Sequence, residues 1–232
     1  MGSVRHVAKV AAAVLAVALQ VAGSPAAAEQ LTLRDRTLVQ TAMGRQLLQY
    51  LVNCALPPET TLAFEVDSTA YVLPGGLGLA PAWAERALTE QEERRVSGCI
   101  LARTNFFGVP VQLSMRSEAA DAREVLKAGE QERQAFPFFE AAFFGNIFQP
   151  ERETYVCTGD NSPGRQAHLQ SLLRVCSLPA SDAPGAVSQS RCNFVITGTC
   201  RDESFQRHGT DYTADAIRVY LPAAPMGASA PR

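Results

Sequence analysis

The sequence predicts an α+β fold in which two main helices pack on a small, mainly antiparallel sheet that is stapled by disulfides. Three observations favour this class. Two segments repeat their apolar residues at helical spacing, and other segments alternate apolar with polar residues, as half-buried strands do. The chain also contains six cysteines, an even number that is typical of disulfide-bonded proteins in oxidising compartments.

The clearest local pattern begins at Thr89. Thr89 can cap a helix, and Glu92 can reach back to the Thr89 amide to complete a capping box. Apolar residues then recur at helical spacing as far as Phe107, and Gly108 is expected to end the helix because glycine adopts the left-handed conformation at little cost. The alternation over 109–116 predicts that a half-buried strand follows directly.

The first main helix is expected over 31–54, where apolar residues form a stripe along one face. Thr32 or Asp35 can cap its start. Pro57-Pro58 should follow its end, because proline has no N–H to donate to the helical ladder.

Alternation over 61–66 and again around 70–73 predicts a β-hairpin that turns at Asp67-Ser68. The connection that follows, 74–81, is rich in glycine, but it matches neither of the glycine motifs that bind phosphates. We therefore expect a loop that packs beside Trp83 rather than a phosphate site.

The stretch 118–134 is charged and rich in alanine, which suits an exposed helix or a connector. The next stretch, 136–148, holds six of the eleven phenylalanines. Pro137 and Gly145-Asn146 are typical of the first turn and the end of a short helix, so the sequence predicts a helix here. Its phenylalanines would form either a plug in the core or an exposed binding patch.

The remaining elements are predicted from shorter patterns. A strand and turn are expected around 155–160, a helix from Ser162-Pro163 to Cys176, and a short strand between Cys192 and Cys200. A final strand is expected over 217–221.

Both ends of the chain lie outside the predicted domain. Residues 1–28 combine a positive start, a short apolar run and a small-residue ending, which predicts a secretory signal peptide. A single domain should then occupy 29–222, and a disordered tail rich in proline, alanine and glycine should occupy 223–232. We expect a secreted or periplasmic protein with no membrane span once the signal peptide is removed.

All six cysteines fall in the mature part of the chain: Cys54, Cys99, Cys157, Cys176, Cys192 and Cys200. Six cysteines allow 15 pairings, among which a sequence does not choose. Our hypothesis joins Cys54 to Cys99, between the two main helices, and pairs the other four among themselves. A thiol hydrolase built on Cys99 with His168 or His208 is disfavoured, because Cys99 falls in the middle of a predicted helix rather than at a helix start.

Charge and motifs exclude several classes of function. The formal net charge is −2 at pH 7 and no basic patch is visible, so nucleic acid is an unexpected partner. No C-x-x-C is present and the histidines stand apart, so neither a metal site nor a cofactor is predicted. The serine and zinc hydrolase motifs G-x-S-x-G and H-E-x-x-H are also missing from the sequence.

Glu140 is the sharpest catalytic candidate. Its phenylalanine neighbours would desolvate the carboxylate and raise its pKa towards the range of a general acid. A glycosidase would need a second carboxylate roughly 5–10 Å away, which the sequence does not identify. The alternative is that Glu140 lies on the wet side of a helix or pairs with an arginine.

Four further residues are candidates for ligand binding. Arg103, Asn105 and Arg116 flank the predicted helix–strand junction and could meet as a polar recognition site. Their structural alternative is that the arginine stems cover apolar surface and Asn105 bonds locally. Trp83 could stack on a sugar or a peptide, although a lone tryptophan is more often buried in a core.

The phrases NCALPP, LGLAPAW, GCILARTNFFGVPVQLSMR and FFGNIF resemble those of an uncharacterised family of secreted bacterial proteins. The resemblance would cover most of the mature chain, but it implies no activity and no functional residues. The sequence therefore favours a non-catalytic module that binds a protein or an envelope glycan. The alternative is a hydrolase of extracellular polymers that uses Glu140 with an unidentified partner, and a structural or inhibitory protein is a third hypothesis.

Overall fold

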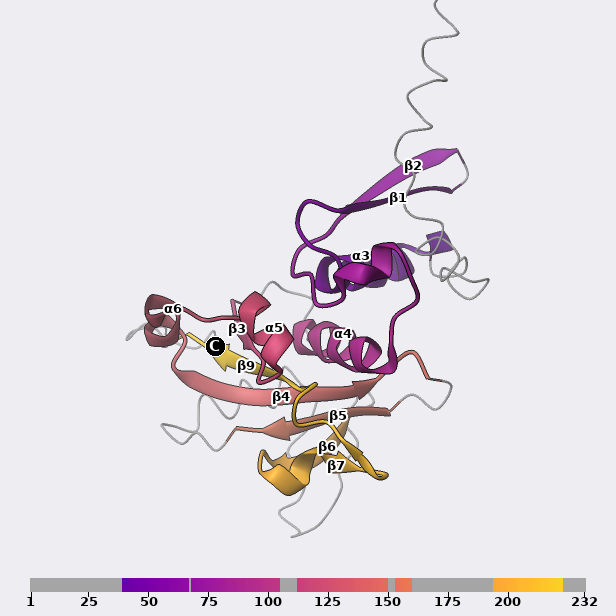
Figure 1. Ribbon diagram of the computed structural model, residues 1–232. Helices are drawn as coiled ribbons and strands as arrows, with labels where there is room; N and C mark the ends of the chain where they lie inside the picture. The colour runs from indigo at the N-terminus through magenta and orange to yellow at the C-terminus, as the bar shows by residue number, and fades with distance from the viewer. Residues whose placement is uncertain (1–38, 67, 105–111, 150–152, 160–193, 223–232) are drawn as a thin grey trace, which may run out of the picture.

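The computed structural model describes residues 39–66, 68–104, 112–149, 153–159 and 194–222. A five-stranded sheet in the order β3-β9-β4-β5-β6 carries helix α4 on one face, and helix α3 with a separate β-hairpin lies beyond α4 (Figure 1). Only the pairing of β5 with β6 is parallel among the described strands. The predicted α+β class, with a mainly antiparallel sheet and disulfide staples, is confirmed.

The strands and short helices have the following bounds. The hairpin consists of β1 (Thr61–Val66) and β2 (Thr69–Pro74), and the five-stranded sheet consists of β3 (Ser114–Arg116), β4 (Phe138–Asn146), β5 (Glu153–Thr158), β6 (Val195–Thr199) and β9 (Ile217–Leu221). Two short strands, β7 (Gln206–Arg207) and β8 (Thr210–Asp211), pair with each other, and the small helices are η1 (Pro81–Ala84), α5 (Ala120–Val125), α6 (Glu130–Ala135) and η2 (Asp202–Phe205). The predicted hairpin and the predicted strand over 217–221 are confirmed.

Helix α3 (Ala42–Ala55) begins after Thr41, whose hydroxyl accepts a hydrogen bond from the Gly44 amide at 3.0 Å. The predicted caps Thr32 and Asp35 lie outside the described residues.

The glycine-rich loop 75–80 satisfies the carbonyl groups at the end of α3. Three loop amides donate to the last three helical carbonyls, which have no partner inside a helix. The pairs are Leu77 to Asn53, Leu79 to Cys54 and Ala80 to Ala55, at 2.7, 3.0 and 2.9 Å. The loop approaches the helix so closely that a Cβ atom on Gly75 would lie 2.2 Å from the Pro57 carbonyl oxygen. These amides are therefore occupied, which agrees with a packing loop rather than a phosphate-binding one.

Helix α4 (Glu90–Arg103) has the predicted capping box: Thr89 accepts from the Glu92 amide, and the Glu92 carboxylate accepts from the Thr89 amide at 2.8 Å. The helix ends at Arg103, four residues earlier than predicted, and Thr104 is extended. The Thr104 hydroxyl bonds back to the Leu101 carbonyl at 2.7 Å, so a side chain closes the last turn before any glycine is reached. Residues 105–111, which include the predicted stop at Gly108, lie outside the described part of the chain.

The prediction of a helix over 136–148 was wrong. This stretch forms β4, the central strand of the sheet, and six consecutive residues from Ala141 to Asn146 are buried. Alternate side chains enter two different cores, since Phe143 belongs to the cluster beneath α4 and Phe144 to the cluster on the other face. A strand buried on both faces is apolar without alternation, which is why its pattern resembled a buried helix.

Two disulfides fasten the layers. Cys54–Cys99 joins α3 to α4, with a Cα–Cα distance of 6.1 Å, and Cys157–Cys200 joins β5 to the residue after β6. The predicted link between the two main helices is confirmed, while Cys176 and Cys192 lie outside the described residues. The first core lies between α3, α4 and the sheet, and among the described residues no helix is long and apolar enough to cross a membrane.

Candidate functional site

The face of the five-stranded sheet that is turned away from α4 carries an aromatic cluster. Phe144 of β4 lies at its centre, with the rings of Tyr155, Phe205 and Tyr212 at 5.4, 5.2 and 5.6 Å. The strands supply Phe144 and Tyr155, and the segment around η2 folds back under the sheet to supply the other two rings. Two arginines lie over rings of this cluster, and a third lies over the Tyr220 ring of β9.

Two of these arginines face each other across neighbouring strands. Arg116 of β3 lies directly opposite Arg218 of β9 in the antiparallel register. The neighbours of Arg218 in β9, Ile217 and Val219, belong to the core beneath α4, so Arg218 points to the opposite face. Residues that lie opposite each other in an antiparallel pair share a face, with Cβ atoms about 4.5–5.5 Å apart. The two positive charges therefore lie on the same face.

Arg116 is held by three contacts. Its guanidinium lies 3.7 Å from the centre of the Tyr220 ring, Nη2 donates to the Phe136 carbonyl at 2.9 Å, and Nε donates to the Ser114 hydroxyl at 3.2 Å. None of these groups is a carboxylate. The positive charge of Arg116 is thus fixed in position by a ring and two neutral acceptors.

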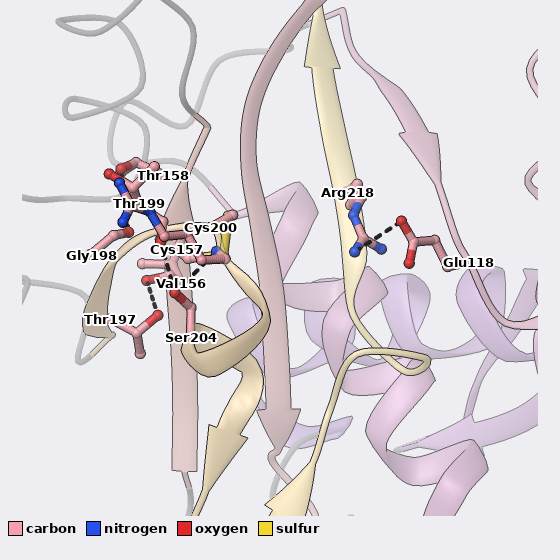
Figure 2. The surroundings of a disulfide bond; sticks show 11 residues. Glu118, Val156, Cys157, Thr158, Thr197, Gly198, Thr199, Cys200, Ser204 and Arg218 are labelled. Carbon is pink, nitrogen blue, oxygen red and sulfur yellow. Dashed lines mark hydrogen bonds and ion pairs between the residues drawn. A yellow bond between two sulfur atoms is a disulfide. The ribbon is translucent and has the colours of Figure 1, made fainter.

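Arg218 is half-buried, and its guanidinium lies 5.3 Å from the centre of the Phe205 ring. Its Nη2 atom forms an ion pair with Glu118 Oε1 at 3.0 Å (Figure 2). Glu118 is 54% exposed at its side chain, so solvent screens this ion pair and weakens it. Within the described part of the chain, the buried Nη1 atom of Arg218 has no hydrogen-bond partner.

Arg207 of β7 is the third guanidinium, 5.9 Å from the centre of the Tyr155 ring. Its Nε atom is also buried without a hydrogen-bond partner among the residues that the structure describes. We call Arg116, Arg207 and Arg218, with the rings beneath them, the arginine face. Two buried donors on this face lack an acceptor among the described residues, which is uncommon in folded proteins and marks a place where an acceptor would be stabilising.

The guanidinium groups of this arrangement are suited to bind an anion. A guanidinium presents fixed donors that match carboxylate and phosphate oxygens, and stacking on an aromatic ring holds it in place. Like charges directly opposite each other on a sheet are destabilising. A negatively charged ligand between Arg116 and Arg218 would remove this repulsion, so these two residues form the centre of the candidate site.

Glu140 lies in β4, where the register against β9 shifts between Phe139 and Ala141. Glu140 is 5% exposed, and its main-chain carbonyl accepts a hydrogen bond from the Gly159 amide at 2.7 Å. A general acid must come within hydrogen-bond reach of the substrate oxygen that it protonates. The burial of Glu140 leaves little surface for a polymer to approach it. The described residues contain no group of three or more side chains placed to hold a metal ion.

The other predicted ligand residues lie apart from the arginine face. Arg103 donates to the Asn53 side chain and so links α4 to α3, and burial lowers the pKa of its guanidinium. Trp83 is 3% exposed within the first core, where its ring has no surface for stacking on a ligand. Asn105 lies outside the described residues. Of the predicted recognition residues, only Arg116 contributes to the site that the structure points to.

Sequence reasoning missed Arg207 and Arg218. The available signal for Arg218 was its place within 217–221, where it interrupts an apolar strand with a charge. Arg207 carries no comparable signal, since its position over Tyr155 depends on how the segment after β6 folds back.

A separate groove of about 230 Å³, lined by both apolar and charged residues, lies near β3 and α5. Its lining residues are Leu77, Leu113, Met115, Val125, Leu126, Lys127 and Glu132. Glu140 does not line it, so the groove gives no support to the catalytic hypothesis.

Comparison of the chain with protein-family models, with curated proteins and with solved structures gives no match.

Proposed function

We propose that the chain is a secreted or periplasmic, non-catalytic binding module whose ligand is a protein or an envelope glycan that carries anionic groups. The observation that carries this proposal is the pair Arg116 and Arg218, opposed on neighbouring strands and each lying over an aromatic ring. A site that is fixed before the ligand arrives loses little conformational entropy on binding. This favours recognition of an anionic group over a merely structural role for both arginines.

The proposed compartment rests on two features. The two disulfides are consistent with an oxidising environment, and the first 28 residues have the composition of a signal peptide. Detection of a mature chain that starts near Glu29 in the culture medium or the periplasm would support export. A full-length chain retained in the cytosol would contradict it.

Hydrolysis by Glu140 receives less support, because a residue that is 5% exposed must first be uncovered before a polymer can reach it. The test is release of reducing ends from polygalacturonate and from a neutral glucan. Activity that is lost in Glu140→Gln, in a variant that keeps the wild-type circular dichroism, would replace binding with catalysis as the function.

The binding test uses two anionic probes and one neutral probe. Polygalacturonate presents carboxylates on a glycan, polyglutamate presents them on a peptide chain, and dextran presents none. We expect saturable binding of one or both acidic probes and no binding of dextran. Binding should weaken about 10- to 100-fold in Arg116→Gln and in Arg218→Gln, since a charge-assisted hydrogen bond contributes about 1.5–3 kcal/mol.

The matched control is Lys127→Gln. Lys127 is 66% exposed at its side chain and contacts Glu124 at 3.8 Å, so this change removes one exposed positive charge that belongs to neither Arg116 nor Arg218. Binding that falls equally in Lys127→Gln would show attraction by overall charge rather than a site. Wild-type affinity in the folded double variant Arg116→Gln/Arg218→Gln would refute the proposal.

A further inference from the structure

The β1–β2 hairpin is a sheet of its own with two edges. It projects from the body of the molecule beyond α3 (Figure 1), and among the described strands neither β1 nor β2 pairs with any other. An edge strand presents main-chain N–H and C=O groups that can pair with another strand. The main-chain groups that each edge leaves available therefore decide what the hairpin can bind.

The direction of these groups follows from the register. The Gly75 amide donates to the Thr60 carbonyl at 2.8 Å, which places Thr60 and Gly75 at a hydrogen-bonding position of the ladder, while the Thr60 amide donates to the Pro57 carbonyl. Such pairs alternate along antiparallel strands with pairs that are not hydrogen-bonded. Thr61, Ala63 and Glu65 therefore direct their N–H and C=O groups away from β2.

The edge of β2 is closed at one end. Pro74 has no N–H to offer, and its carbonyl accepts from the Gln49 side chain of α3 at 3.3 Å. Helix α3 also packs against β2. The β1 edge has none of these protections in the part of the chain that the structure describes: it carries no proline, and its Thr61 and Glu65 side chains are exposed.

The β1 edge is complementary to itself. If two copies of β1 meet antiparallel about a two-fold axis at Ala63, Thr61 of each copy lies opposite Glu65 of the other, so no like charges meet. Each of these opposed pairs can exchange two main-chain hydrogen bonds. On the outer surface, Val72, which is 63% exposed and lies opposite Ala63, would align with its equivalent in a row across four strands.

We propose that this chain forms a homodimer by pairing the β1 edges of two copies into one four-stranded sheet. A two-fold interface uses the same patch on both copies, and the sequence Thr61–Ala63–Glu65 meets that requirement. The inference is independent of the arginine face, because the two surfaces lie on different sheets.

The test is sedimentation equilibrium of the mature chain over a wide range of protein concentration. The wild type should be a reversible dimer. Thr61→Glu would place two glutamates opposite each other at both ends of the interface, so the dimer dissociation constant should rise about tenfold. Thr61→Lys would place a lysine opposite each glutamate and should lower that constant by a similar factor. Thr69→Glu on β2 adds the same charge away from the β1 edge and should leave the dimer constant unchanged.

A main-chain test excludes a purely side-chain effect. Ala63→Pro removes an outward N–H from β1 and should abolish the dimer, while Val72→Pro removes an outward N–H from β2 and should not. A wild type that is monomeric throughout the concentration range would overturn the proposal. So would a dimer that responds alike to both charges at position 61, or alike to the two prolines.

Discussion

Removal of the disulfide between the two main helices should reduce stability by an amount that can be calculated from the chain. Cys54 and Cys99 are 45 residues apart in sequence, and both are fully buried. Closing a loop of this length in the unfolded chain corresponds to about 4 kcal/mol at 25 °C by the chain-entropy relation. The double variant Cys54→Ala/Cys99→Ala should therefore lose about 4 kcal/mol of unfolding free energy, and somewhat more if the vacated volume does not close.

The assay is urea unfolding followed by circular dichroism, with the midpoint and slope fitted together. The second disulfide provides a comparison, because Cys157 and Cys200 are 43 residues apart and the same relation gives nearly the same value, about 4 kcal/mol. A loss below about 1 kcal/mol for the first pair, with an unchanged slope, would refute the view that this link restrains the unfolded chain.

Three further changes test the packing. Gly75→Ala should lower the free energy of unfolding by about 2–4 kcal/mol, because its Cβ would meet the Pro57 carbonyl at 2.2 Å; thermal unfolding measures this, and a wild-type midpoint would contradict it. The pKa of Glu92 is lowered from 4.5 to about 2, chiefly by the hydrogen bond from Arg86. The ionised Glu92 therefore stabilises the fold above pH 4.5, and this contribution is lost as the pH falls towards 2. The difference in unfolding free energy between wild type and Glu92→Gln should shrink over that interval, and a constant difference would disprove the assignment. Asp215→Ala should cost about 3–5 kcal/mol in chemical unfolding, because it leaves the 5%-exposed Arg95 without the carboxylate that it contacts at 3.3 Å; a loss under 1 kcal/mol would show that the pair contributes little.

Local signals predicted the parts of the fold that depend on short-range chemistry. The capping box at Thr89 needs only two side chains three residues apart, so it was visible in the sequence and is present in the structure. The hairpin was predicted from alternation for the same reason, and the short strand over 217–221 was also predicted. The pairing of Cys54 with Cys99 was inferred from their places in the two main helices.

The sequence misled where tertiary packing decides the outcome. Pro137 and Gly145 resemble the start and end signals of a helix. The phenylalanines between them, however, pack into two cores on opposite faces, as the residues of a central strand do. The arginine face could not be predicted as a unit, because Arg116 and Arg218 are brought together by pairing of strands from distant parts of the chain. Arg116 was identified, but with Arg103 as its neighbour, and the structure gives these two residues different partners.

The central claim, that Arg116 and Arg218 form one anion-binding site, is tested most directly by NMR of the arginine side chains. Nε–Hε signals of the wild-type protein are followed while oligogalacturonate is added, and then while oligoglutamate is added. The signals of Arg116 and Arg218 should shift together along one saturable curve with at least one probe. The Arg86 signal should stay constant, because the Glu92 carboxylate already occupies that guanidinium at 2.6 Å. If neither Arg116 nor Arg218 responds to either probe, or if all exposed arginines shift alike, the arginine face is not a binding site.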